Sequence, residues 1–389
     1  MKVVNLSIED MDFPAIRHFR IVVYIFSKTS EPEGQTMTNR ELAKMLGISP
    51  AALSLIINHK PGVSEATRAA VLAQLKEMGQ EHLIKKAPAP PSSNLCFIIY
   101  KRHGEILDLH PFFLLLMENI ENHARSYGYS ILLCTIDKRR PMEPQVEHIN
   151  ALDCQGAILF ATEMQDEDMD IFLNLQIPVV ALDNDFSRLT CNTISINNQM
   201  GTFQAVEYLI KNHHSRIGYL KSSMRISSFE ERRQGYESAL SYFHNAFRPE
   251  DVLDVHYTEE GSFRDMRLFL EEHPPIQLPT AFVSDDDTIA AGAIRALTEK
   301  GIRVPEDISV IGFNDRPVCE VTDPPLTSVN VSKHAMAVEA VDELMRLIQN
   351  QGNTPGETRS RKIRIGTKLL IRQSVAKARE LYDVPNRLL

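Results

Sequence analysis

Hydrophobic positions follow two different patterns along the chain, and the change falls near residue 95. Between residues 39 and 78 the apolar residues recur every three or four positions, which is the spacing of short amphipathic helices. After residue 95, short and almost wholly apolar runs alternate with longer amphipathic stretches. The short runs are typical of buried strands, and the longer stretches predict helices. We therefore expect an all-α N-terminal part followed by an α/β part.

The runs in the second part form two similar series. The first series predicts strands at 95–101, 130–136, 156–161 and 178–183, with a helix near 111–127. The second series predicts strands at 216–220, 280–284 and 308–313, with helices near 229–244 and 287–300. Such alternation predicts doubly wound parallel sheets. Because about 280 residues exceed one typical domain, we expect a two-lobed, periplasmic-binding-protein-like body.

The N-terminal helices have the spacing of a helix-turn-helix, the fold that lays its second helix in a DNA groove. The stretch Thr38 to Asn58 reads TNRELAKMLGISPAALSLIIN. Ala43 is small where two helices must approach, and Gly47 tolerates the positive φ of the turn. The residues expected to fill the space between the helices are Leu42, Leu46, Ile48, Leu53 and Ile56. An ordinary helical hairpin would share this spacing.

The expected helix ends favour DNA binding over a simple hairpin. Thr38-x-x-Glu41 has the form of a capping box for the first helix. Ser49 is a favoured N-cap for the second helix, and the next residue, Pro50, suits the first helical position. A third helix is expected after Ser64, with an inner face of Val71, Leu75 and Met78.

Two further segments flank this unit. Residues 1–36 precede it, and their helical stretch at 12–28 predicts an N-terminal extension packed on the helix-turn-helix. Residues 87–94, APAPPSSN, predict a proline-rich linker, because proline at this density prevents helix and favours an extended spacer.

Charge adds a modest argument for nucleic acid. The 389 residues carry a net charge of −9, but Met37 to Lys86 contain seven Lys and Arg against four Asp and Glu. That segment therefore has a charge of +3, which leaves −12 for the rest. A mildly basic head on an acidic body suits a protein that touches phosphate at one end.

The remaining composition indicates an ordinary cytoplasmic protein. The five cysteines are scattered without metal or redox spacing, so they are expected to be small core residues. We recognise neither a membrane-spanning run nor a secretory signal.

Polar and aromatic residues recur just after the expected strands, where ligands bind in doubly wound sheets. The candidate ligand-binding residues are Phe112, Phe113, Asp183, Arg232, Tyr257, Asp286 and Asn314. Rings can cover an apolar ligand face, while carboxylate, amide and guanidinium groups bind hydroxyls or amides. Structural alternatives stay open: Asp286 or Asp287 could cap the following helix, and one of the two phenylalanines could belong to the core.

Motifs for catalysis are not recognisable. The sequence contains no Gly-x-Gly-x-x-Gly, Walker loop or Gly-x-Ser-x-Gly, and no spaced His or Cys pair for a metal. We expect no enzymatic activity, no catalytic residue, no cofactor and no metal.

The order of helix-turn-helix, linker and two-lobed body resembles the lactose repressor/galactose repressor (LacI/GalR) family of bacterial transcription regulators. The resemblance covers about residues 37–376 and is most specific in TNRELAKMLGIS, PGVSEATRAAVLAQLKEMG, HPFF, DDDTIAAGAIRALTEKGIRVPEDISVIGFND and DPPLTSV. It implies a homodimer that binds an inverted-repeat operator and is controlled by a small metabolite that closes the lobes.

The resemblance also implies roles for the candidate residues. The family's pocket aspartate falls on Asp183, its pocket arginine on Arg232 and its aromatic lid on Tyr257. The remaining positions fall on Asp286, usually Asn in the family, on Asn314, often Asp, and on the aromatic pair Phe112 and Phe113.

The resemblance implies the following division of the chain. After the extension come a DNA-binding domain at 37–86, the linker at 87–94, an effector-binding and dimerisation domain at 95–376, and a tail at 377–389. The N-lobe is expected at about 95–196 and 329–360, and the C-lobe at about 197–328 and 361–376. The tail lacks the apolar heptads of a tetramerising coiled coil, so a dimer is expected.

Two departures from the family concern DNA. Pro50 and Ala51 stand at base-reading positions, and a family arginine is replaced by Leu55; these side chains cannot make paired hydrogen bonds to bases. The family's hinge helix, which inserts a leucine wedge into the minor groove, falls on Pro88 and Ala89, so we expect little kinking of the operator. The candidate DNA-contacting residues are Thr38, Ser49, Pro50, Ala51, Ser54, Asn58, His59 and Lys60.

We therefore expect a ligand-responsive regulator, more often a repressor than an activator, with a sugar or sugar derivative as effector. A purine or nucleoside remains an alternative, because stacking rings and Asp or Asn pairs also suit a base. A solute-binding protein without DNA function and an enzyme on a doubly wound sheet are the competing classes.

Overall fold

The computed structural model describes residues 39–58, 62–78, 80, 83, 94–104, 111–273, 277–350 and 359–378, without the side chains of residues 39, 65, 66, 111 and 112. The chain divides into two compact units, residues 1–90 and 91–389. The expected N-terminal extension, most of the proline-rich linker and most of the tail lie outside the described residues. Within the described part, no helix has the length and apolarity needed to cross a membrane.

The first unit contains the three helices that the sequence predicts. They are α1 Asn39–Met45, α2 Pro50–Ile57 and α3 Glu65–Glu77. Leu42, Ala43, Leu53 and Ile56 are completely buried and form one apolar cluster with Val71 and Leu75. The helix-turn-helix interpretation of residues 39–58 is therefore supported by the packing of both helices against α3.

The caps inside this unit also agree with the sequence. Ser49 Oγ accepts a hydrogen bond from the N–H of Ala52 at 3.0 Å, and Ser64 Oγ accepts one from Thr67 at 3.2 Å. Gly47 has φ of +67°, which a glycine adopts without strain. Thr38 lies outside the described residues, so its capping box stays a prediction.

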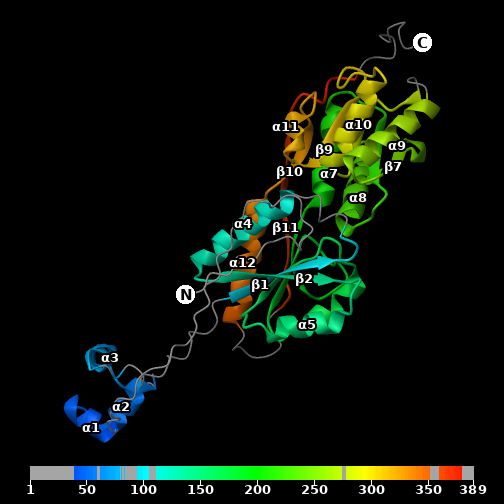
Figure 1. The fold of residues 1–389 in the computed structure, drawn as a ribbon. Helices are drawn as coiled ribbons and strands as arrows, with labels where there is room; N and C mark the ends of the chain where they lie inside the picture. The colour runs from blue at the N-terminus through cyan, green and yellow to red at the C-terminus, as the bar shows by residue number, and fades with distance from the viewer. Residues whose placement is uncertain are drawn as a thin grey trace, which may run out of the picture. The chain divides into compact units, whose positions relative to one another are not determined.

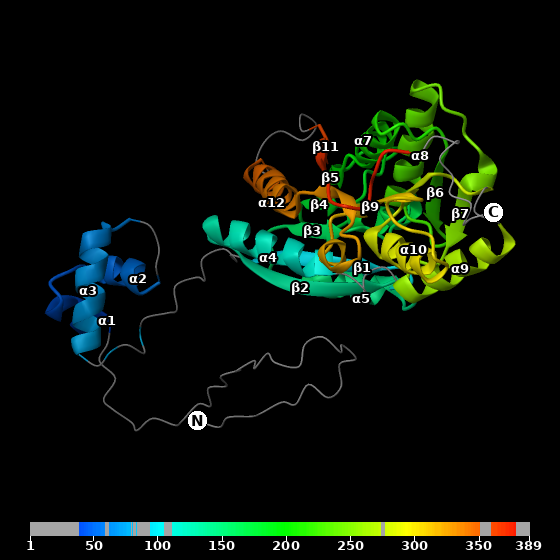
Figure 2. The same ribbon diagram turned by 90° about the horizontal axis from the view of Figure 1, so that it is seen from above.

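The second unit contains two lobes, each built on a six-stranded sheet (Figures 1 and 2). In the first lobe the strand order is β11-β5-β4-β3-β1-β2, and all neighbours are parallel. The strands are β1 Asn94–Lys101, β2 Ser130–Asp137, β3 Ala157–Phe160, β4 Val179–Leu182, β5 Asn192–Ile196 and β11 Lys362–Ile365. Helices α4 Pro111–Ser126 and α12 Lys333–Gln349 cover one face, α5 Met142–Ala151 covers the other, and α6 Asp170–Leu173 follows β3.

The second lobe repeats this plan with the order β12-β10-β9-β8-β6-β7, in which only β12 is antiparallel to its neighbour. Its strands are β6 Ile217–Ser222, β7 Val252–Val255, β8 Ala281–Ser284, β9 Ser309–Asn314, β10 Thr327–Val331 and β12 Thr367–Leu370. Helices α7 Asn198–Lys211 and α8 Ser227–Tyr242 cover one face. Helices α9 Glu259–Glu272 and α10 Asp287–Glu299 cover the other, and α11 Val318–Val321 is a short turn after β9.

Every strand and helix that the hydrophobic pattern predicts in the body is present, with ends within two residues of expectation. The pattern did not reveal strands β5, β7, β10, β11 and β12 or helices α5, α6, α7, α9, α11 and α12.

The chain crosses between the lobes three times, after β5, after β10 and after β11. Two crossings differ from the expected boundaries. Residues 362–365 form β11 in the first sheet, where Ile363 pairs with Ile194, so the chain enters the second lobe near Gly366 and not at 361. Strand β10 keeps the chain in the second lobe as far as Val331, beyond the expected boundary at 329. Strand pairing, which the local pattern does not encode, decides both points.

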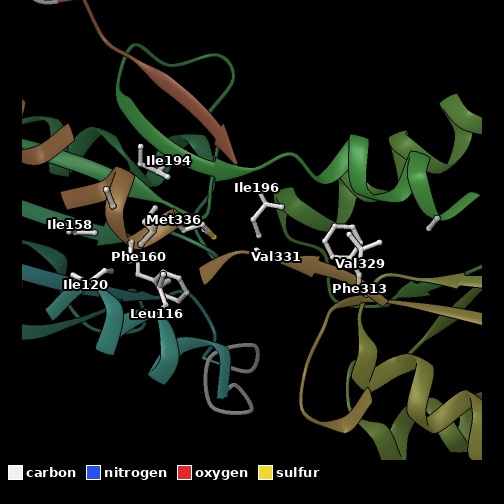
Figure 3. Close-up of a cluster of buried hydrophobic side chains, with 14 of the residues drawn as sticks. Leu116, Ile120, Ile158, Phe160, Ile194, Ile196, Phe313, Val329, Val331 and Met336 are labelled. Atoms are coloured by element: carbon white, nitrogen blue, oxygen red, sulfur yellow. The ribbon is translucent and has the colours of Figure 1, made fainter. Parts of the chain in front are cut away.

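A single apolar cluster runs through both lobes along these crossings. Figure 3 shows Ile196 and Val331, the last residues of β5 and β10, between the first-lobe side chains Phe160 and Met336 and the second-lobe side chain Phe313. The two sheets are therefore joined by buried apolar contacts as well as by the backbone.

Candidate functional site

A buried polar network lies at the carboxyl ends of the second-lobe strands, and Arg232 on α8 is at its centre. Its side chain is 3 % exposed. Nε donates to Asn198 Oδ1 at 2.9 Å, Nη1 to the carbonyl oxygen of Asp285 at 2.6 Å, and Nη2 to Asn314 Oδ1 at 3.2 Å. The guanidinium carbon lies 3.8 Å from the centre of the Phe313 ring. Stacking and three hydrogen bonds thus hold the guanidinium in one plane.

The spacing Arg232-x-x-Gly235 has a packing reason. A Cβ atom on Gly235 would lie 2.4 Å from the carbonyl oxygen of Gln199, so α8 packs against the start of α7 only when this position is glycine. That approach brings Arg232 within hydrogen-bond distance of Asn198, the first residue of α7.

Asn314, the last residue of β9, joins three parts of the structure. Besides accepting from Arg232, its Nδ2 donates to Asp286 Oδ2 at 2.7 Å. Its carbonyl oxygen accepts from Lys333 Nζ of the first-lobe helix α12 at 3.1 Å. Its φ is +99°, a conformation that costs free energy for any residue but glycine and that the surrounding bonds stabilise.

Asp286 lies beneath this surface and has no exposed area. Its Oδ1 accepts from the N–H of Thr288 at 2.8 Å, so the residue caps α10, as the structural alternative allowed. Arg316 Nη1 lies 3.4 Å from the same oxygen. Asp286 is therefore placed to hold Asn314 and Arg316 rather than to meet solvent.

The neighbouring carboxylate, Asp287, is also structural. It accepts from Ser328 Oγ at 2.6 Å and from the N–H of Arg316 at 2.8 Å. Burial, together with the charge of Asp286, raises its pKa to about 7. A Cβ on Gly312 would lie 2.1 Å from Asp287 Oδ1, so glycine is required where β9 passes this side chain.

Tyr257 joins the network through Arg316, a residue that the sequence reasoning missed. Arg316 Nη2 donates to the hydroxyl of Tyr257 at 3.3 Å, and Nη1 donates to the hydroxyl of Thr288. The ring of Tyr257 packs against Phe229 with centroids 5.7 Å apart. The one available sequence signal was position, because Arg316 follows Asn314 by two residues in the loop after β9.

The first lobe contributes Asp183, which directly follows β4 with φ of +67°. Its Oδ2 accepts from the hydroxyl of Thr162 at 2.6 Å. Burial raises the pKa of Asp183 to about 6, while the bond from Thr162 and the positive charge of Arg232 act in the opposite direction.

The aromatic pair expected beside the ligand is only partly described. The ring of Phe113 lies 6.0 Å from that of Phe97 and 5.6 Å from that of Phe160, inside the core of the first lobe. Phe113 is therefore half-buried and packs against the core, which is compatible with the core alternative. The side chain of Phe112 lies outside the described residues.

On the DNA-binding unit, the candidates of α2 form an accessible surface. Ser49, Pro50, Ala51 and Ser54 are exposed, and Asn58 is half-exposed with its Nδ2 donating to the carbonyl oxygen of Ser54 at 2.7 Å. The other three candidates, Thr38, His59 and Lys60, lie outside the described residues.

These features define a class. A helix-turn-helix unit precedes a two-lobed α/β body, whose polar side chains gather where the parallel strands end, and this is the architecture of ligand-binding transcription regulators. Known proteins agree. The model of the periplasmic binding protein-like domain matches residues 206–375.

The curated relatives and solved structures extend over most of the chain. The HTH-type transcriptional repressor PurR of Haemophilus influenzae is 29 % identical over 342 residues, 87 % of this chain and 98 % of that protein. PurR of Mannheimia succiniciproducens is 28 % identical over 346 residues, 87 % of this chain and 99 % of that protein. A transcriptional regulator CelR–cellobiose complex matches with a TM-score of 0.63 and 25 % identity over 87 % of this chain and all of that one.

The fold is also that of a lac repressor dimer bound to operator and the anti-inducer ONPF, with a TM-score of 0.64 and 23 % identity over 88 % of this chain and all of that one. Over most of its length the chain is therefore similar to transcription repressors and regulators, and it shares the fold of the lac repressor.

Proposed function

We propose that this protein is a cytoplasmic repressor that binds an inverted-repeat operator as a homodimer and responds to a small effector bound between its lobes. The observation that carries the proposal is the buried, hydrogen-bonded pair of Arg232, on α8, and Asn314, at the end of β9, together with the buried Asp183 that directly follows β4 in the first lobe. The relatives named above are repressors, which favours a regulator over an enzyme or a solute-binding protein.

Each candidate residue has a proposed role. Arg232, Asn314 and Asp183 hydrogen-bond the effector, and Tyr257 and Phe112 pack against it. Asp286 supports Asn314 and Arg316 from below, and Phe113 supports the aromatic wall from within the core.

A sugar or sugar derivative is the proposed effector. A guanidinium, an amide and a carboxylate offer both donors and acceptors to hydroxyl groups, and the related CelR structure contains cellobiose. A purine is the second candidate, because the relatives named PurR align with 87 % of this chain over almost their full length. The same amide and guanidinium pair can bind the edge of a base, with Tyr257 stacked on its face.

Isothermal titration against mono- and disaccharides, nucleobases and nucleosides separates these candidates. Once a ligand is found, Arg232→Ala is expected to abolish its binding heat while operator affinity, measured by gel shift, stays unchanged. The matched control is Arg233→Ala, because Arg233 is adjacent but pairs with Glu237 on its own helix at 2.9 Å. If Arg232→Ala lost operator affinity as well, Arg232 would be a structural residue and the site assignment would be wrong.

The exposed face of α2 determines how DNA is read. Ser49, Pro50, Ala51 and Ser54 carry no charge, so base contacts are proposed to come from hydroxyl groups and from apolar contact with thymine methyls. Phosphate contacts are left to basic residues of the unit, such as the exposed Arg40 and Lys44 of α1.

The operator itself is expected to stay nearly straight, because Pro88 and Ala89 occupy the family's wedge positions. The test uses an operator selected from random DNA and placed at different positions in fragments of equal length. The gel mobility of the protein–DNA complex should depend little on where the operator lies. A strong bend at the operator centre would contradict this reading of the linker.

A further inference from the structure

An ion pair spans the two lobes beside the candidate site. Arg364 lies on β11 of the first lobe, and its Nη2 is 2.8 Å from Asp185 Oδ2 in the same lobe. The same nitrogen is 3.2 Å from Glu231 Oε1 on α8 of the second lobe. Glu231 directly precedes Arg232, the central residue of the candidate site.

From Glu231 a continuous chain of hydrogen bonds leads to Arg232. Glu231 Oε2 accepts from Asn198 Nδ2 at 2.8 Å, and Asn198 Oδ1 accepts from Arg232 Nε at 2.9 Å. Both functional atoms of the Asn198 amide are therefore used, one toward each residue. We call Arg364, Glu231, Asn198 and Arg232 the cross-lobe chain.

Burial strengthens the interaction at the lobe boundary. It raises the pKa of Glu231, whereas the bond from Asn198 and the charge of Arg364 lower it. The side chain of Glu231 is 16 % exposed and that of Arg364 is 34 % exposed, so solvent screens this pair less than a fully exposed one. Asp185, two residues from the candidate Asp183, orients the guanidinium from the first-lobe side.

The cross-lobe chain lies at the crossings. Arg364 is one residue before the end of β11, after which the chain enters the second lobe. Asn198 begins α7 directly after the crossing from β5. A rotation of the lobes about these crossings changes the distance between Arg364 and Glu231, and a hydrogen-bonded pair at 3.2 Å weakens steeply when its atoms move apart.

We infer that Arg364 and Glu231 are positioning residues that favour the lobe arrangement in which Asp183 and Arg232 come together, and that they link the state of Arg232 to the lobe crossings. This inference rests on the proposed function, since it takes the site between the lobes as the effector site. Neither residue needs to touch the effector; they act through Asn198 and Arg232.

The test measures lobe arrangement without effector or operator. Spin labels are placed at Arg140→Cys and Ser223→Cys, which are exposed positions after β2 and β6, on strands far from the crossings in each sheet. The background is Cys134→Ser, because Cys134 is half-exposed while the other four cysteines are buried. Pulsed electron–electron double resonance then reports the distance between the labels in the full-length protein.

Two label distances, a short and a long one, correspond to the two lobe arrangements. Arg364→Gln and Glu231→Gln are each expected to lower the population of the short distance relative to the long one roughly fivefold, the effect of losing one partly screened ion pair. The matched controls keep every cross-lobe bond. Arg361→Gln removes an arginine near the start of β11 that pairs with Glu343 within the first lobe at 2.8 Å. Glu237→Gln removes a glutamate of α8 that pairs with Arg233 on the same helix. Both controls should leave the distances unchanged.

The double variant Arg364→Gln/Glu231→Gln decides whether the two residues act together. If the two residues form one unit, the effect of the double variant equals that of either single variant. Additive effects, or unchanged distances in both single variants, overturn the inference. Operator binding is measured on the same samples: a wild-type protein that does not bind DNA refutes the proposed function, whereas unchanged distances with intact DNA binding refute only the cross-lobe inference.

Discussion

The two lobes share nearly the same sheet topology, yet the side chains at their strand ends are bonded differently. In the second lobe Arg232, Asn314, Asp286 and Arg316 bond to one another and are almost completely buried. In the first lobe the corresponding edge carries Arg102, whose side chain is 26 % exposed and which pairs with Asp168 and Glu167.

Hydrogen bonds from the backbone to one buried side chain, together with these ion pairs, organise that first-lobe edge. Glu163 Oε2 accepts from three successive N–H groups, those of Arg102, His103 and Gly104, at 2.9 to 3.1 Å. The second lobe therefore presents a prearranged set of cross-bonded side chains, whereas the first presents a backbone turn held by the buried Glu163, the partly exposed Arg102 and the buried Asp183. Buried and cross-bonded groups lose little further entropy on binding, so we expect the second lobe to determine effector specificity.

The largest expected effect comes from the close contact of Gly312 with Asp287. In Gly312→Ala the new Cβ would lie 2.1 Å from a buried carboxylate oxygen, which should lower the free energy of unfolding by about 3 kcal/mol or more. The control is Gly366→Ala, where a Cβ meets nothing within 4 Å and the change should stay near zero. Urea unfolding followed by circular dichroism measures both. Equal losses would show that the second-lobe network is not rigid at β9.

The next effect concerns Asp183, a buried carboxylate of the first lobe. Because its pKa is raised to about 6, the folded state binds its proton more tightly than the unfolded state. Its contribution to stability is complete below about pH 4 and is lost as pH rises through 6. Asp183→Asn does not titrate, so the unfolding free energy of the variant relative to wild type should rise by on the order of 2–3 kcal/mol between pH 4 and 7.

Thr162→Val gives a second measurement of the same group. It removes a hydrogen bond that favours the charged form, so the pH range in which stability is lost should shift upward. A wild-type protein whose stability profile matches that of Asp183→Asn at every pH would mean that Asp183 is not desolvated.

A smaller effect compares one arginine from each edge. Arg316→Gln leaves the buried Asp286 and the hydroxyl of Tyr257 without their charged partner, and should cost about 2 kcal/mol of unfolding free energy. Arg102→Gln leaves Asp168 still paired with Lys138 and should cost less than about 1 kcal/mol. Thermal and urea unfolding of the two variants side by side check the difference. The reverse order would remove the proposed distinction between a rigid and a solvated lobe.

Much of the site could be predicted because its residues lie at strand ends. Arg232 and Asn314 were found from their position after apolar runs, and the structure connects them directly. Asp286 was found too, but its complete burial and its capping of α10 make it a support. Phe113 packs against Phe97 and Phe160 at the edge of the first-lobe core, a contact that the local pattern did not specify.

Other members of the site could not be predicted, because their partners are distant in sequence. Arg364 and Asp185 are 179 positions apart, and Arg316 and Tyr257 are 59 apart. The importance of Arg316, Glu231 and Asn198 therefore became visible only when the strand order brought β4, β9, β11 and the starts of α7 and α8 together.

The sequence by itself determined the helices of the DNA-binding unit, their serine caps at Ser49 and Ser64, and the strands β1 to β4, β6, β8 and β9 of the two lobes. These features depend on hydrophobic periodicity and capping, which act over a few neighbouring residues. Only the tertiary structure decided that β11 belongs to the first lobe and that Arg364 reaches Glu231 across the boundary. Strand pairing and buried ion pairs join residues from remote parts of the chain, and no local pattern records which remote partner each side chain meets.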